Sequence, residues 1–238
     1  MTSRSDKASG RIGRPGRFWH DNGLGLGFGT AFLIVLVAQA FAGHADYNNQ
    51  LLGDGMAQVG FGDYITSSDF GVDVMENWQS EYLQFFLYIF ATVWLVQRGS
   101  PESKELHKAG RESDEDQMVG EHAREDSPSW AADRGWRQGA YARSLGLAMG
   151  LIFLLSWLAQ SITGTAAYNE QQLRQLQAPT SWAEYLLSSD FWNRTLQNWQ
   201  SELLAIGSMV ILSIYLRQRG SPESKPVGAG HGDTGVEG

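Results

Sequence analysis

The chain has 238 residues, of which 42% are hydrophobic, 18% are charged and none is cysteine, and its formal net charge is −8. The lack of cysteine excludes disulfides, thiolate metal sites and thiol catalysis, and the acidic balance argues against a nucleic-acid partner, because phosphate binding needs a basic surface. A mean hydropathy of −0.28 would suit a soluble protein, but the apolar residues are gathered into blocks, as membrane segments require.

A basic arm over residues 1–17 opens the chain and precedes an apolar segment at about 23–42. This segment reaches the ~20 residues needed to cross about 30 Å of hydrocarbon. It is too long for a signal peptide, and no small-residue cleavage site ends it cleanly, so we predict a retained first span. Residues 47–52 are expected to prolong its helix beyond the membrane, and the arm is expected to be disordered.

A second span is predicted at about 78–97. Its purely apolar part, residues 82–96, is short, so the helix has to begin earlier in the chain. Ser68 is a candidate N-cap, and Asp69 after it places a carboxylate at the positive end of the helix dipole. We therefore expect this helix to start near Asp69, outside the bilayer core.

A charged segment over residues 105–138 follows the second span. It mixes many carboxylates with a few bases and has almost no aliphatic residues, so it cannot bury enough apolar surface to offset the entropy of ordering. We predict a disordered cytoplasmic linker here. The Gly-rich tail at 226–238 is interpreted in the same way.

Residues 139–225 repeat residues 18–104 without a gap, and about 35 of the 87 aligned positions are identical. That number is too large for chance, and an internal repeat decides the architecture. Two motifs recur intact: Asn-Trp-Gln-Ser-Glu at 77–81 and 198–202, and Gln-Arg-Gly-Ser-Pro-Glu-Ser-Lys at 97–104 and 218–225. The chain is therefore predicted to be a duplicated membrane hairpin.

The second copy predicts spans three and four at about 144–163 and 199–217. The third helix should continue through residues 168–176, as its counterpart does in the first copy. The fourth helix should start near Asp190, with Ser189 as its N-cap.

A short helix between spans three and four is predicted by Ser181 and Glu184, which have the spacing of a capping box. Pro179 ends the helix before it. The first copy has Gly-Phe-Gly-Asp at 60–63 in this place, which gives a weaker signal for the corresponding short helix.

Lys and Arg are distributed unevenly about the four spans. Residues 44–81 contain neither, and residues 163–202 contain only Arg174 and Arg194, whereas the termini and the linker hold all the others. The positive-inside rule therefore places both termini and the linker in the cytoplasm and both hairpin loops outside. Two spans per copy make the repeat parallel rather than inverted. We predict an all-α, integral membrane four-helix bundle of two such hairpins.

Glycines four residues apart occur at the same place in spans one and three. They are Gly25, Gly29, Gly146 and Gly150. Small residues at this spacing let two membrane helices approach closely, so we predict a packing contact between the two copies or between two chains, which would make a homo-oligomer. Ordinary use of glycine in a membrane helix is the alternative interpretation.

Polar residues lie near the outer ends of the spans. At 1.5 Å per residue, they are about 24–26 Å from the cytoplasmic ends, close to one hydrocarbon thickness. We predict a polar ring just beneath the outer surface, formed by Gln39, Asn77, Glu81, Gln160, Asn198 and Glu202. It either fixes the bundle through hydrogen bonds between helices or forms a shallow outward-facing site for a proton, cation or small polar solute. Trp78 and Trp199 lie at the same depth and are predicted interface anchors.

The residues indicate no further chemistry. We find no acid–base pair, activated nucleophile or metal-ligand set, so we predict no catalytic residue, cofactor or metal. The leading hypothesis is a non-enzymatic structural or interaction component in contact with the lipid bilayer, with no protein partner indicated. The alternative is a small transporter or channel whose outer vestibule is formed by Gln39, Glu81, Gln160 and Glu202. An intramembrane enzyme has the least support.

The pentapeptide that opens spans two and four and the octet that closes them are fairly specific. In both motifs the chain resembles a family of small integral membrane proteins from actinobacteria and other bacteria, classified as a domain of unknown function. The resemblance covers both copies. It implies a bacterial plasma membrane location and brings no reaction, ligand or catalytic residue.

Overall fold

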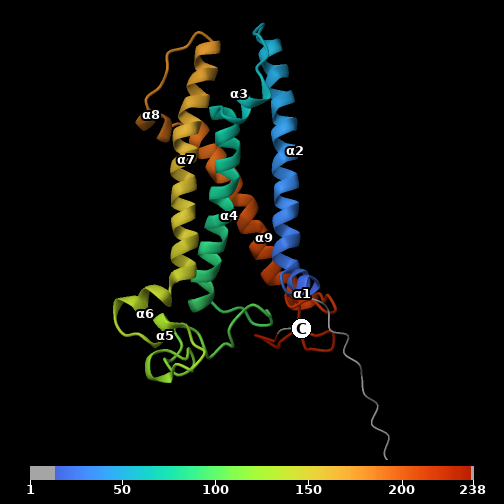
Figure 1. Ribbon diagram of the computed structural model, residues 1–238, viewed down its shortest axis with the longest axis vertical. Coiled ribbons are helices and arrows are strands. Elements are labelled where there is room, and N and C mark those ends of the chain that lie inside the picture. The colour runs from blue at the N-terminus through green and yellow to red at the C-terminus, as the bar shows by residue number, and fades with distance from the viewer. Residues whose placement is uncertain (1–13, 237–238) are drawn as a thin grey trace, which may run out of the picture. The chain divides into compact units, whose positions relative to one another are not determined.

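The computed structural model describes residues 14–236, and side chains from residue 18 onward (Figure 1). Over this range the chain is helical and has no strand, which confirms the all-α class. The predicted basic arm falls mostly on residues 1–13, which lie outside the described residues, as do residues 237–238 of the tail. The chain divides into two compact units, residues 1–70 and 71–238, and each is described by itself.

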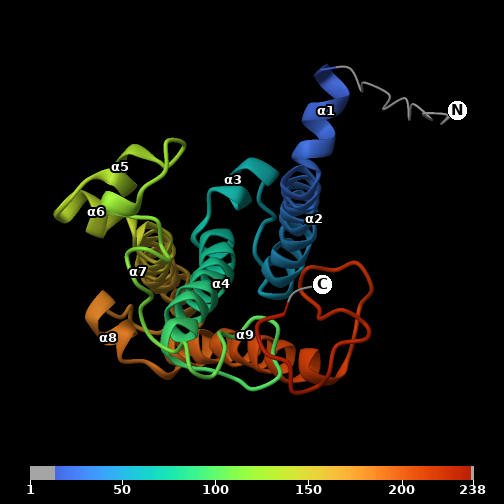
Figure 2. The ribbon, with the colours of Figure 1, turned by 90° about the horizontal axis from the view of Figure 1, so that it is seen from below.

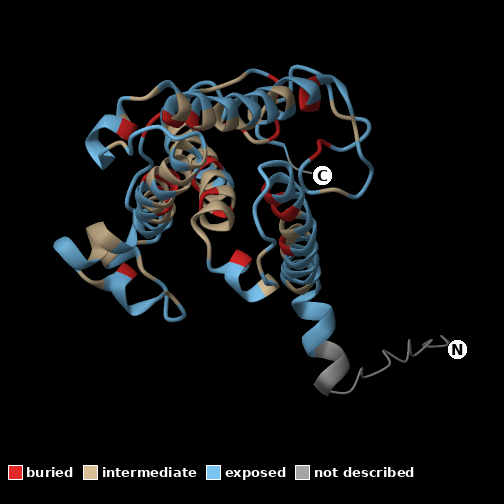
Figure 3. Ribbon diagram, turned by 90° about the horizontal axis from the view of Figure 1, so that it is seen from above, coloured by how far each residue is buried: buried red, intermediate tan, exposed pale blue. Residues whose placement is uncertain are grey.

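The first unit contains α1 (Arg14–Asp21), α2 (Gly23–Gly53) and α3 (Phe61–Ile65). With 31 residues, α2 is about 46 Å long. It continues past the predicted first span, as expected for residues 47–52. Most of its side chains are exposed (Figure 3). The weakly predicted short helix is present as α3.

The chain folds back after α2, where one side chain of the helix forms two hydrogen bonds with the backbone of a single loop residue. The side chain of Asn48 accepts a hydrogen bond from the Val59 amide at 2.8 Å and donates one to the Val59 carbonyl at 3.1 Å. Tyr64 of α3 is then buried beside Gly43 of α2. A Cβ at Gly43 would lie only 2.1 Å from the Tyr64 hydroxyl oxygen, so this approach requires glycine.

The second unit contains most of α4 (Ser68–Trp94), together with α7 (Ser144–Arg174), α8 (Trp182–Leu186) and α9 (Ser189–Tyr215). The starts of α4 and α9 agree with those predicted near Asp69 and Asp190. Their predicted N-caps are wrong by one residue. Ser188 caps α9 by accepting from the Phe191 amide at 3.2 Å, and Ser67 accepts from the Phe70 amide at the start of α4.

The fold-back of the second copy has the same construction as that of the first. The side chain of Asn169 accepts a hydrogen bond from the Thr180 amide at 2.7 Å and donates one to the Thr180 carbonyl at 2.9 Å. A Cβ at Gly164 would lie 2.6 Å from the hydroxyl oxygen of the buried Tyr185. The capping box predicted for Ser181 and Glu184 is present at the start of α8, which confirms that short helix.

The linker and the tail, both predicted to be disordered, hold local structure in the described range. The linker has a 3₁₀ turn, η1 (Gly120–His122), and the short helices α5 (Ser129–Ala132) and α6 (Trp136–Tyr141), which lie near the start of α7 (Figures 1 and 2). The Lys225 ammonium is buried and donates to three tail carbonyls, Gly230, His231 and Asp233. These contacts use backbone carbonyls rather than an apolar core, which explains why composition did not indicate them.

Two helices are long and apolar enough to cross a membrane, α2 and α7. They correspond to predicted spans one and three. Within residues 14–236 no other helix meets both conditions: α4 and α9 are long enough, with 27 residues each, but their polar first halves leave them insufficiently apolar.

Candidate functional site

The second unit is built on a close approach of α7 to α4 (Figure 1). A Cβ added at Gly150 would lie 3.1 Å from the ring of Phe86, and one at Gly146 would lie 3.9 Å from Ile89. The glycine pair of the second copy thus faces a helix of the first copy. At Gly25 and Gly29 an added Cβ would meet no described atom within 4 Å.

A layer of buried and half-buried aromatic and amide side chains joins α7 and α9 to α4. The Trp199 ring packs against Trp157 and Phe153 of α7, at centroid distances of 5.7 Å and 6.3 Å. Its indole N–H donates to the side-chain oxygen of Gln79 on α4 at 2.8 Å. Gln79 is completely buried. Trp199, predicted as an interface anchor, therefore directs its polar atom into the protein.

Gln160 of α7, three residues after Trp157, is also completely buried. Neither its amide oxygen nor its amide nitrogen has a hydrogen-bond partner among the described residues. An unpartnered amide in an apolar layer costs about 1–3 kcal/mol. Gln160 is therefore the polar ring residue whose burial most needs an explanation.

The other predicted ring residues are distributed differently. Asn77 and Asn198 donate to carbonyls of their own helices, those of Asp73 and Arg194. Glu81 is exposed, and the half-buried Glu202 lies near it and near the Ser80 hydroxyl. Gln39 belongs to the first unit, where it is half-buried. Of the predicted set, the second unit brings Glu81 and Glu202 together.

A charge cluster lies between the N-terminal halves of α4 and α9. Arg194 contacts the Glu76 carboxylate at 3.1 Å, Asp190 at 3.4 Å and Asp73 at 4.0 Å. Burial raises the pKa of Glu76 above its ordinary value, and the attraction of Arg194 offsets part of that rise. Burial and the Asp190 carboxylate also raise the pKa of Tyr185, whose hydroxyl donates to Asp190 at 3.0 Å.

The two bases that interrupt the otherwise base-free hairpin segments are both paired with carboxylates. Arg194 is neutralised by carboxylates of both copies, and Arg174 is paired with Glu170 one turn earlier on α7. Asp73 is the repeat counterpart of Arg194. The copies thus carry opposite charges at equivalent positions that face each other.

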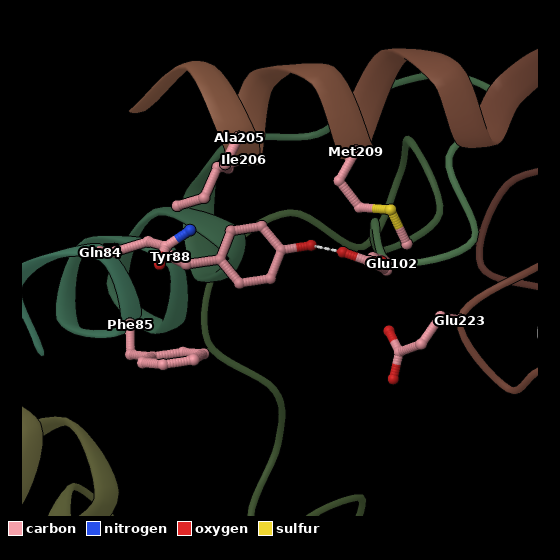
Figure 4. A pocket seen from close by; sticks show the side chains of 8 residues that line it. All are labelled: Gln84, Phe85, Tyr88, Glu102, Ala205, Ile206, Met209 and Glu223. Carbon is pink, nitrogen blue, oxygen red and sulfur yellow. Dashed lines mark hydrogen bonds between the residues drawn. The ribbon is translucent and has the colours of Figure 1, made fainter. Parts of the chain in front are cut away.

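Two more carboxylates, those of Glu102 and Glu223, line a cavity of about 310 Å³ between α4 and α9 (Figure 4). Its lining begins at Gln84 and Ala205, about one turn after the predicted ring residues Glu81 and Glu202. The Tyr88 hydroxyl donates to the Glu102 carboxylate, and Glu223 lies close enough to share a hydrogen bond with Glu102. Burial and the neighbouring Glu223 raise the pKa of Glu102.

The lining of this cavity consists of four pairs of repeat-equivalent residues. They are Gln84 and Ala205, Phe85 and Ile206, Tyr88 and Met209, and Glu102 and Glu223. The two octets therefore each contribute their glutamate to the same cavity between α4 and α9. The intact octet was the available signal, but nothing in it indicated that its two glutamates would lie at one cavity.

The contacts of Gln79 and Arg194 were also missed. Opposite charges at the equivalent positions 73 and 194 could have indicated the ion pair. For Gln79 there was no comparable signal, because the pentapeptide does not show which of its side chains face a neighbouring helix.

Comparison with curated proteins and with solved structures gives no match. The model of one protein family, described as a domain of unknown function (DUF6766), matches residues 15–236. The matched range includes both copies and the linker, so the duplication and the segment between its halves lie inside a single family domain. The chain therefore belongs to the DUF6766 family of domains of unknown function.

Proposed function

We propose that the chain is a non-enzymatic, four-span protein of the bacterial plasma membrane that acts as a structural or interaction component. In this proposal α2, α4, α7 and α9 all cross the bilayer, with both termini and the linker in the cytoplasm. The observation that carries it is the packed layer in which Trp199 of one copy bonds Gln79 of the other.

The dimensions of α4 and α9 support their assignment as spans. Each has 27 residues, or about 40 Å at 1.5 Å per residue. Their charged side chains lie in the first halves, and residues 82–94 and 203–215 contain none. A charged outer end and an apolar inner half suit a helix that begins above the outer surface of the membrane.

The exposed surface of α7 supports a lipid environment. Leu147, Leu151, Leu154 and Leu158 are all about half exposed or more. A continuous apolar surface of this kind is unfavourable in water and normal against acyl chains.

The structural role is tested with Glu81→Gln and Glu202→Gln in one chain. The proposal expects the variant to fold with an unchanged melting temperature in detergent. Proteoliposomes of the wild-type protein and of the variant should both pass H⁺, Na⁺ and K⁺ no faster than empty liposomes. Flux through the wild-type protein that the variant loses would instead establish transport.

Transport or channel activity is the second candidate function, with the outer vestibule at Gln39, Glu81, Gln160 and Glu202. One observation favours it. The Glu81 and Glu202 side chains are neighbours, and the amide of Gln84, one turn further along α4, donates to the Glu202 carbonyl at 3.5 Å. Paired carboxylates at a membrane interface are a common feature of ion pathways.

Self-association through the glycine faces is tested directly, because the chain has no cysteine to remove. Gly25→Cys should form disulfide-linked dimers under mild oxidation if this face meets a second chain. Gly53→Cys, on the same helix, serves as the control. Equal crosslinking at both positions would reject the glycine face as the contact.

A further inference from the structure

The cavity between α4 and α9 is lined by two carboxylates, by the side chains of Gln84 and Tyr88, and otherwise by apolar side chains (Figure 4). We propose that it binds a small organic cation, an ammonium or guanidinium group carried on an apolar body. The lining of this cavity includes neither Gln79 nor the neighbouring Glu81 and Glu202, which lie about one turn away. The proposal therefore does not depend on the structural role.

The charge of the occupant follows from Glu102 and Glu223. Their carboxyl groups approach within hydrogen-bond reach, and the lining of the cavity contains no Lys, Arg or His. Two like charges at this separation destabilise each other unless a proton or a cation lies between them. The Tyr88 hydroxyl already donates to Glu102 and can hold that carboxylate in position for a cationic head group.

The apolar body of the occupant follows from the rest of the lining. Phe85, Ile206 and Met209 supply a ring, a branched chain and a thioether. Aromatic faces attract organic cations, and a mainly apolar cavity of about 310 Å³ is in the size range of small-molecule sites.

A metal ion fits these ligands less well. A bound Mg²⁺ or Ca²⁺ takes six or more oxygen ligands, whereas the lining offers two carboxylates, one phenol and one amide. Within the described range no group of three or more acidic or histidine side chains is arranged to hold a metal.

The space arises because the two copies have diverged at these positions. The first copy provides Gln84, Phe85 and Tyr88, and the second has the slimmer Ala205, Ile206 and Met209 in their places. Both copies keep the glutamate. The duplication thus supplies a matched carboxylate pair, and the divergence around it leaves room for a ligand.

The experiment is isothermal titration calorimetry on the full-length protein in detergent, with phenethylammonium and tetraethylammonium as probes. The neutral 2-phenylethanol, which has nearly the shape of phenethylammonium, reports apolar partition into protein and micelle. The test variant combines Glu102→Gln and Glu223→Gln. The control combines Glu115→Gln and Glu125→Gln, which change net charge equally at exposed linker positions.

At least one cation is expected to bind the wild-type and control proteins at least tenfold more tightly than the Glu102/Glu223 variant. The wild-type protein should also bind phenethylammonium at least tenfold more tightly than 2-phenylethanol. Tyr88→Phe should weaken binding without abolishing it, and gives an independent readout if the double variant does not fold. The proposal is wrong if neither cation binds, if 2-phenylethanol binds equally, or if MgCl₂ binds at the pair and displaces the probes.

Discussion

The indole N–H of Trp199 donates a hydrogen bond to the side-chain oxygen of Gln79 over 2.8 Å, and Gln79 is 0% exposed. Both residues belong to the Asn-Trp-Gln-Ser-Glu motif, one from each copy. The duplicated motif thus bonds to itself across the repeat. A sequence element that is written twice supplies both the donor and the acceptor of one buried contact.

This contact predicts different effects for two equivalent glutamines. Gln79→Leu leaves the indole N–H without its acceptor and should lower the free energy of unfolding by about 1–2 kcal/mol. Gln200→Leu, at the exposed equivalent position, should change it by no more than about 0.5 kcal/mol. Chemical denaturation in detergent, followed by tryptophan fluorescence, measures both. Equal effects of the two variants would contradict a stabilising role of this hydrogen bond.

Arg194 is expected to stabilise the packing of the N-terminal halves of α4 and α9 by compensating the charge of Glu76, whose side chain is only 17% exposed. Arg194→Met should destabilise the protein, because it leaves that carboxylate half-buried without its partner. Adding Glu76→Gln should restore most of the loss. The control is Arg137→Met, which breaks an exposed one-turn ion pair with Asp133 and should have little effect. Failure of Glu76→Gln to rescue would contradict the pairing.

The fold-back after α2 depends on the lack of a side chain at Gly43. Gly43→Ala should lower the melting temperature, because the new Cβ would overlap the hydroxyl of the buried Tyr64. Tyr64→Phe should relieve part of that overlap and raise the melting temperature of the double variant. Gly53→Ala, on the same helix where an added Cβ meets nothing within 4 Å, is the control. A harmless Gly43→Ala would mean that Tyr64 does not pack there.

The raised pKa of Glu102 predicts that the stability of the protein depends on pH. Its pKa is raised above the ordinary 4.5 by burial and by Glu223, so the folded state binds the proton more tightly than the unfolded state. The stability from this group is complete below 4.5 and is lost as the pH rises through the raised value. Glu102→Gln should therefore gain stability relative to the wild-type protein as the pH rises from about 4 to about 8. Thermal unfolding across that range measures the difference, and a constant difference would contradict the shift.

Local chemistry was predictable where one turn of chain determines it. The capping box of Ser181 and Glu184 and the start of α9 near Asp190 follow from neighbouring residues. The cap itself was placed one residue late, because Ser188 and Ser189 both offer a hydroxyl. Only the extended backbone at Ser188, with φ −74° and ψ 154°, selects between them.

Long-range contacts were not predictable from the same sequence. Which side chains of α4 meet α9 depends on the angle at which two helices pack, and the repeat does not specify that angle. Glu102 and Glu223 were visible as members of a repeated octet, but their meeting at a cavity follows only from the packing of both helices. Gln160 was identified as a polar residue just beneath the outer surface, whereas its complete burial without a hydrogen-bond partner among the described residues was not predicted.

The proposed protein has four spans, with both hairpin loops outside and the linker inside. The most direct test of this topology labels single-cysteine variants in intact cells with a membrane-impermeant maleimide, since the natural chain has no cysteine. Ala57→Cys and Ala178→Cys, in the two exposed outer loops, should be labelled. Glu125→Cys in the linker and Val227→Cys in the tail should be labelled only after the cells are opened. Labelling of Glu125→Cys in intact cells, or protection of either loop position, would contradict the four-span topology.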